Sequence, residues 1–111
     1  MLWCIYVVDK PNSEATRLKL REAHMAYLKS MDSVCFFTGP LLTDDGTGMV
    51  GSLWIVSADS RADAQAFLEG EAFYKAGIFK SVKINRMRAG GHFHPEFHPL
   101  HAPTRGGAST R

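Results

Sequence analysis

His24 follows Arg21 by one helical turn and Arg17 by two, in a stretch with helical periodicity. Residues three or four apart lie on one face of a helix, so these three side chains are expected to share a face. A histidine can accept or donate a proton near neutral pH, and guanidinium groups hold anions. The pattern indicates a site in which His24 moves a proton while Arg21 and Arg17 hold an acidic or enolate-like substrate. A histidine that only hydrogen-bonds a neighbour would fit the same spacing.

The tripeptide Thr38-Gly39-Pro40 is a second candidate for the site. It could place backbone N–H groups and a hydroxyl at the mouth of a cavity. Glycine and proline are also common in a plain turn at the end of a strand. We therefore treat the tripeptide as a candidate substrate-binding segment, with an ordinary strand end as the alternative.

Short apolar runs separated by turn residues predict the strands that would position these groups. The runs are rich in aromatic and β-branched residues, which favour strands. The expected strands are residues 2–8, 34–38, 50–57 and 79–87. The turn sequence Asp44-Asp45-Gly46 predicts that the second and third strands form a hairpin with a long loop.

Two helices are expected between the strands. Apolar residues at spacings of three and four predict one helix from Ser13 to about Met31. Ser60 is the expected N-cap of a second helix, which Gly70 interrupts before a short extra turn at residues 71–76. The order β-α-β-β-α-β is that of an α+β, ferredoxin-like sandwich.

The first and third strands are apolar on both faces, which is unusual for a sheet with helices on one side only. Something must cover the second face. A second copy of the chain is the simplest candidate, because most oligomers are symmetric dimers. The sequence therefore predicts a homodimer.

The composition is that of an ordinary globular chain, with 45% hydrophobic and 22% charged residues and a net charge of +2. Basic residues do not cluster, so no nucleic-acid partner is expected. We expect no membrane segment and a cytoplasmic location. No phosphate-cradling glycine loop follows a strand, so no organic cofactor is implied.

The segment from residue 89 onward differs in composition and is expected to lie outside the domain formed by residues 1–88. It contains Gly and Pro at intervals and four histidines with one glutamate: His92, His94, Glu96, His98 and His101. These side chains are good ligands for a divalent metal. The segment could instead pack over a partner subunit or have no fixed structure, and all three alternatives stay open.

Five features taken together resemble the YCII-related domain family. They cover about residues 1–88 and are the following: an opening strand that ends in Asp9-Lys10; Arg21-x-x-His24-x-x-x-Leu28; Thr38-Gly39-Pro40; Gly51-Ser52; and Ser60-x-x-x-Ala64 followed by Glu71-Ala72-Phe73-x-x-Ala76-Gly77-Ile78-Phe79. The resemblance implies a ferredoxin-like monomer that pairs through its sheet into a dimeric α/β barrel. Muconolactone isomerases and cofactor-independent monooxygenases belong to that wider group, and one activity in the family itself is dehydrochlorination of a chlorinated hydroxyquinol.

The resemblance also implies that His24 is catalytic and has an acidic partner. The family often carries Asp-Pro-Tyr or Asp-Pro-Phe after the second helix, where this chain has Glu71-Ala72-Phe73. It also often has an Asp just after the first helix, near the place of Asp32. The resemblance therefore leaves two carboxylates, Glu71 and Asp32, as candidate partners of His24.

The leading interpretation is a small, cofactor-independent enzyme that carries out elimination or isomerisation on a small acidic or aromatic substrate. His24 would be the general acid or base, in a cleft lined by the first helix, the first strand and the Gly-Pro turn. A non-catalytic module that binds a small molecule or supports an assembly is the alternative. A metal-binding tail is the third interpretation.

Overall fold

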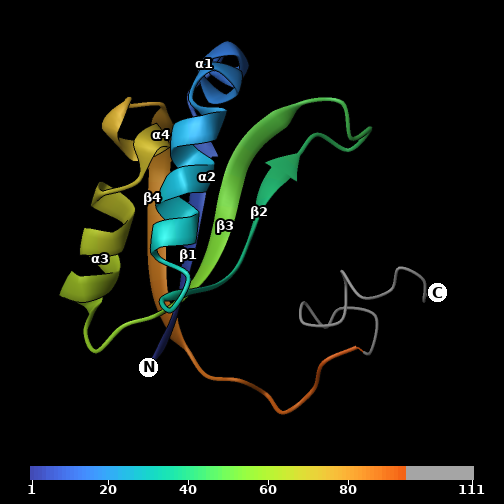
Figure 1. Ribbon diagram of the computed structural model, residues 1–111. Helices are drawn as coiled ribbons and strands as arrows, with labels where there is room; N and C mark the ends of the chain where they lie inside the picture. Colours follow the sequence, from blue (N-terminus) through green and yellow to red (C-terminus); the bar gives the residue numbers. More distant parts are fainter. Residues whose placement is uncertain (95–111) are drawn as a thin grey trace, which may run out of the picture.

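The computed structural model describes residues 1–94, which form one antiparallel four-stranded sheet with helices on one face (Figure 1). The strands lie in the order β2-β3-β1-β4. Their bounds are β1 Leu2–Asp9, β2 Cys35–Leu42, β3 Met49–Ser57 and β4 Phe79–Met87. The helices are α1 Glu14–Lys19, α2 Arg21–Ser30, α3 Arg61–Glu69 and α4 Ala72–Lys75. The predicted ferredoxin-like α+β fold is confirmed.

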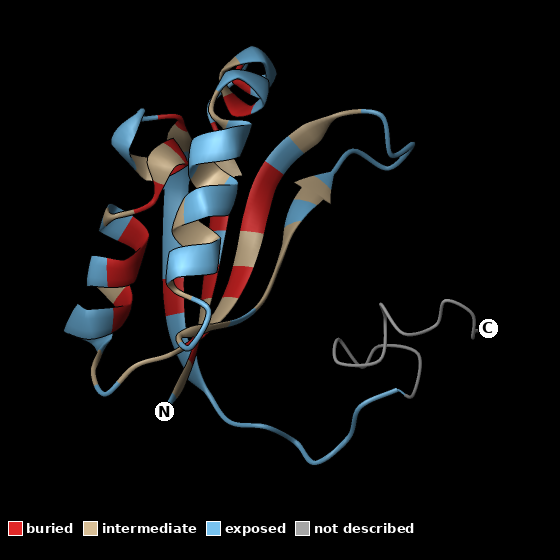
Figure 2. Cartoon of the chain, in the orientation of Figure 1, coloured by how far each residue is buried: buried red, intermediate tan, exposed pale blue. Residues whose placement is uncertain are grey.

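The core lies between the sheet and α3. Every second residue of β1 points toward the helices, and the buried residues of Figure 2 run along β1, β3 and the inner side of α3. The buried cluster is Trp3, Ile5, Val7, Trp54, Val56, Ala64, Phe67, Leu68 and Ile84. Ser60 caps α3 as predicted, since its hydroxyl accepts the Asp63 N–H at 3.1 Å.

The expectation of one helix from Ser13 to Met31 is wrong. Leu20, with φ −98° and ψ 9°, ends α1 and begins α2. The two helices therefore point in different directions (Figure 1). The break lets Arg17 on α1 reach Asp9 at the end of β1, in a buried contact that apolar periodicity does not reveal.

The expectation that Gly39-Pro40 closes the second strand is also wrong, because β2 continues through it to Leu42. β2 is an edge strand, and an edge strand tolerates proline where the missing N–H would face away from its neighbour. Pro40 lies opposite Ser52 in the register with β3. The hairpin between β2 and β3 is confirmed, with Gly46 in the left-handed conformation (φ 77°) in its loop.

The second face of the sheet carries the other residues of β1, of which Tyr6 is 45% exposed. Phe36 is 58% exposed, whereas Trp3 and Trp54 lie in the core.

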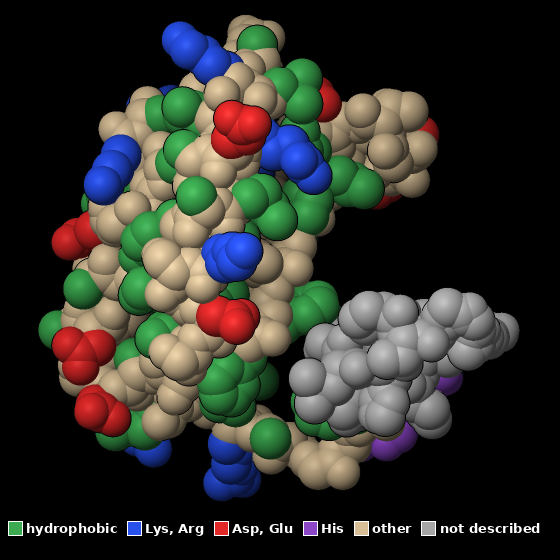
Figure 3. Space-filling view, viewed as in Figure 1, with side chains coloured by type: hydrophobic (Ala, Val, Ile, Leu, Met, Phe, Trp, Pro, Cys, Tyr) green, Lys and Arg blue, Asp and Glu red, His purple; other side chains and the backbone are tan. Residues whose placement is uncertain are grey.

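The view in Figure 3 shows Lys and Arg side chains spaced among Asp and Glu side chains rather than gathered in one patch. Among residues 1–94, no helix has the length and apolar character that a membrane crossing needs.

Candidate active site

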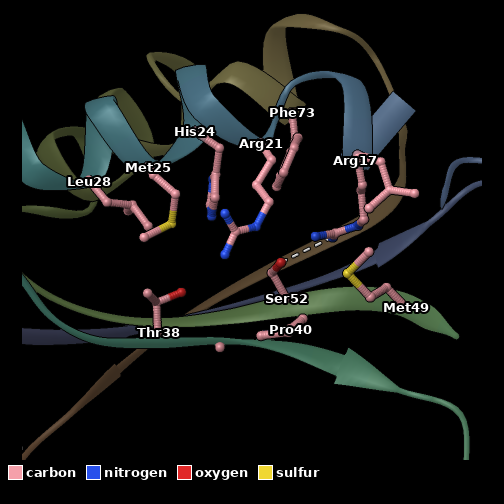
Figure 4. Close-up of a pocket in the computed structure, with 12 residues that line it drawn as sticks. Arg17, Arg21, His24, Met25, Leu28, Thr38, Pro40, Met49, Ser52 and Phe73 are labelled. Atoms are coloured by element: carbon pink, nitrogen blue, oxygen red, sulfur yellow. Dashed lines mark hydrogen bonds between the residues drawn. The ribbon is translucent and has the colours of Figure 1, made fainter. Parts of the chain in front are cut away.

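A cavity of about 280 Å³ lies between α1 and α2 above and β2 and β3 below (Figure 4). Its walls are Arg17, Leu18, Arg21, His24, Met25, Leu28, Thr38, Gly39, Pro40, Met49, Ser52 and Phe73. The structure thus brings together the expected arginines, histidine and Thr-Gly-Pro segment. The expectation that the first strand lines the cleft is wrong, because β3 separates β1 from β2 and supplies the floor instead.

His24 pairs with Glu71 across the contact between α2 and α4. Its Nδ1 lies 2.5 Å from Oε2 of Glu71, whose side chain has no exposed surface. The other carboxylate oxygen, Oε1, accepts the backbone N–H of Phe73 at 3.1 Å and so caps α4. Asp32, the other candidate partner, is exposed beyond the end of α2 and lines a different hollow of the surface. The carboxylate that contacts His24 is therefore that of Glu71.

The orientation of the His24 ring follows from this contact. When Glu71 is ionised its carboxylate can only accept hydrogen bonds, and Nδ1 is then the nitrogen that carries a proton toward Glu71. The Phe73 ring stacks on the imidazole, with centroids 4.3 Å apart and planes 19° apart. The His24 side chain points into the cavity (Figure 4). Nε2 of a neutral His24 is then a base that faces a ligand.

The charge of Glu71 also acts on Tyr27, one turn of α2 beyond His24. Burial raises the pKa of Tyr27, and the nearby negative charge of Glu71 raises this pKa further. The Tyr27 hydroxyl donates to the carbonyl of Phe67 at 2.8 Å. A Cβ at Gly70 would lie only 2.6 Å from the same hydroxyl, so glycine lets α2 pack closely on the segment that carries Glu71.

Arg17 lines the cavity, but most of its donors are already engaged. Its Nε and Nη2 donate to the two oxygens of Asp9, at 2.6 and 2.9 Å. Nη2 also donates to Oγ of Ser52 at 3.0 Å, and the guanidinium lies 4.6 Å from the centre of the Phe73 ring. Arg17 and Asp9 are both nearly fully buried. Asp9, Ser52 and Phe73 are parts of the site to which the sequence analysis gave no role, although all three lie in the segments that carry the resemblance.

Arg21 differs from Arg17 in its surroundings. It is exposed on α2, and its guanidinium reaches over the cavity beside His24 (Figure 4). The ion pairs within residues 1–94 are Arg17 with Asp9 and His24 with Glu71. Arg21 therefore has no carboxylate partner in this part of the chain. Arg21 is therefore the cation that an anionic ligand in this cavity would meet.

A metal site is not formed by the part of the chain from residue 1 to 94, where no three His, Cys, Asp or Glu side chains are grouped to hold an ion. Glu96, His98 and His101, which the metal interpretation also needs, lie outside the described residues. That interpretation remains a prediction from the sequence.

Replacement of Glu71 by Gln should lower the pKa of Tyr27. A negative charge disfavours the phenolate, so its loss makes the phenol easier to ionise, while burial keeps the pKa above its ordinary value. The ultraviolet difference spectrum of ionised tyrosine, followed against pH, measures this shift. Glu69→Gln, at an exposed position two residues away, is the matched control and should leave the titration unchanged. An equal titration in wild type and Glu71→Gln would mean that Glu71 is uncharged in the folded protein.

Known proteins share this fold and part of this sequence. A family model described as "YCII-related domain" matches residues 1–88. Protein YciI of Escherichia coli is 31% identical over 95 residues, which cover 79% of this chain and 97% of that protein. Protein YciI of Shigella flexneri matches with the same figures.

A solved structure extends the comparison. The dehydrochlorinase TftG of Burkholderia phenoliruptrix, which acts on 5-chloro-2-hydroxyhydroquinone, superimposes with a TM-score of 0.74 at 34% identity. The match covers 81% of this chain and 96% of TftG, whose structure holds 2,5-dihydroxybenzoquinone. The family match over residues 1–88, together with relatives of this identity and coverage, shows that the chain belongs to the YCII-related domain family.

Proposed function

We propose that this chain is a small enzyme that uses His24 to move a proton on a small acidic or aromatic substrate. The observation that carries the proposal is the pairing of His24 with the fully buried carboxylate of Glu71 at the wall of a cavity. A histidine held by a buried carboxylate is the arrangement that general acid–base catalysis uses, because the carboxylate fixes the ring and stabilises its protonated form.

The chemistry follows from these positions. Arg21 holds the negative charge of the substrate, and Nε2 of His24 takes a proton from the substrate. The electron pair left behind forms a new double bond. In an elimination a leaving group departs from the neighbouring atom, and in an isomerisation His24 returns the proton to a different carbon. Glu71 stabilises the imidazolium between the two steps, and neither step requires an organic cofactor.

The likeness to TftG supports elimination as the reaction type. TftG is a dehydrochlorinase, and the molecule in its structure is a single ring with oxygen substituents. A cavity of about 280 Å³ is at the small end of ligand sites, which suits one substituted ring better than a larger ligand. Hydroxylated aromatic compounds and small aromatic acids are therefore the substrates that we favour.

We also propose that the enzyme is a homodimer joined through the second face of the sheet. Leu2, Cys4, Tyr6 and Val8 alternate with the core residues of β1 and so point away from the helices. Sedimentation velocity should give twice the chain mass of 12.3 kDa. Tyr6→Lys should give a monomer, because it places a charge in the middle of that face, whereas Lys10→Glu, beyond the end of β1, should not. A wild-type monomer at micromolar concentration would contradict this assembly.

Replacement of His24 by Ala should reduce turnover by roughly 100- to 10,000-fold, the usual contribution of a positioned acid or base. The assay would offer chlorinated hydroxyquinols, small aromatic acids and lactones, and would follow chloride release and ultraviolet absorbance. His92→Ala, an exposed histidine, is the matched control and should keep the wild-type rate.

A thermal-shift measurement on the same proteins separates catalysis from binding. The variant His24→Ala should melt as a folded protein, at a lower temperature than wild type because one oxygen of the buried Glu71 loses its partner, and still be stabilised by compounds that Arg21 holds. Equal turnover in His24→Ala and wild type would contradict the proposal. Stabilisation by these compounds without any turnover in the wild type would favour the alternative of a non-catalytic binding module.

A further inference from the structure

Two hydroxyl groups, from Ser52 on β3 and Thr38 on β2, lie on the floor of the cavity beneath His24 and Arg21 (Figure 4). Pro40 is the register partner of Ser52, and Trp54 is the partner of Thr38. Ser52 and Thr38 are therefore diagonal neighbours on the same face of the sheet, with Cα atoms roughly 7–8 Å apart. One small ligand can contact both hydroxyls.

The hydroxyl of Ser52 is set as a donor. A guanidinium has only donors, so Oγ of Ser52 must accept the bond from Nη2 of Arg17. The proton of the Ser52 hydroxyl then points elsewhere, and Ser52 donates no hydrogen bond within residues 1–94. Ser52 is largely buried but lines the cavity, so its hydroxyl can be approached only from the cavity side. An acceptor atom of a ligand would satisfy it, and the bond from the charged Arg17 strengthens it as a donor.

The hydroxyl of Thr38 is set the opposite way. It donates its proton to the backbone carbonyl of Leu53, at 2.8 Å. A carbonyl oxygen can only accept, so the proton of Thr38 is used and its oxygen has only lone pairs left. Toward the cavity Thr38 is therefore an acceptor.

We propose that these two hydroxyls select a ligand with an acceptor oxygen at one end and a hydroxyl donor at the other. The acceptor end is a carboxylate, phenolate or enolate oxygen that binds Ser52 and Arg21. The donor end is a hydroxyl that binds Thr38. Hydroxylated aromatic acids and polyhydroxylated rings have this polarity. The inference rests on the proposed function, since it concerns the same cavity.

Ser52 has a catalytic role in this arrangement. When His24 removes a proton, negative charge develops on the substrate oxygen that Ser52 contacts. A donor already fixed in place stabilises that charge without reorganisation. Arg17 and Asp9 are positioning residues, since they act on the substrate through the Ser52 hydroxyl.

The test is the affinity of two probes, para-hydroxybenzoate and para-fluorobenzoate, measured by isothermal titration calorimetry. The probes share the carboxylate and are similar in size, but only the first has a donor at the far end. Wild type should prefer the hydroxyl compound by roughly 3- to 10-fold, the usual value of one neutral hydrogen bond. Thr38→Val, which keeps the shape of the side chain, should remove this preference, and Thr38→Ser should keep it.

Ser52→Ala should weaken both probes alike, by roughly 10- to 100-fold, since it removes a hydrogen bond to a charged oxygen. Ser52→Cys, with a weaker donor, should lie between wild type and Ser52→Ala. Melting temperatures measured on the same samples report whether each variant is folded.

Three outcomes would overturn the inference: unchanged affinity in Ser52→Ala, a hydroxyl preference that survives in Thr38→Val, or no binding of either probe to wild type. The proposed function is judged separately by turnover in His24→Ala. Suppose that turnover is lost in His24→Ala but probe binding is unaltered in Ser52→Ala and Thr38→Val. This result would support proton transfer by His24 and would reject the proposed donor and acceptor roles of Ser52 and Thr38.

Discussion

A carboxylate with no exposed surface, that of Glu71, lies where α2 meets α4. Burial of a charge without partners costs several kcal/mol, so both of its oxygens need hydrogen bonds. One oxygen takes the N–H of Phe73 and begins α4, and the other takes Nδ1 of His24 and holds α2. The same two contacts that make burial of Glu71 tolerable also fix the ring of His24 at the cavity wall. The stability of this contact and the proposed reactivity of His24 therefore depend on one side chain.

A second buried pair arranges the opposite end of the cavity. Arg17 and Asp9 neutralise one another and bring α1 down onto the sheet. Arg17 also orients the hydroxyl of Ser52, to which it donates a hydrogen bond. Because Arg17 is paired with Asp9, Arg21 is the cation that faces the cavity. The result is a small site with a base and a cation above and fixed hydroxyl groups below. An acidic, oxygen-rich ligand matches that distribution of charge and donors.

The order of strands and helices could be predicted from the sequence because it rests on local patterns of apolar and turn residues. The spacing of three and four residues that groups His24 with Arg21 and Arg17 is also a local pattern. The break at Leu20 could not be predicted, since the apolar periodicity continues through it. Spacing alone also could not choose between Asp32 and Glu71, which is 47 residues away from His24 along the chain. The role of Ser52 depends on the register of β3 against β2, which only the structure gives.

In the proposed mechanism, Glu71 holds the proton of His24 on Nδ1 and leaves Nε2 to the substrate. Nitrogen-15 NMR of the imidazole ring at neutral pH tests it directly, because the two nitrogens resonate differently with and without a proton. We expect a proton on Nδ1, with a strongly hydrogen-bonded signal that Glu71→Gln removes. A proton on Nε2 with a bare Nδ1 would mean that Glu71 is itself protonated and donates to His24, and it would contradict the proposed role of Nε2 as the base.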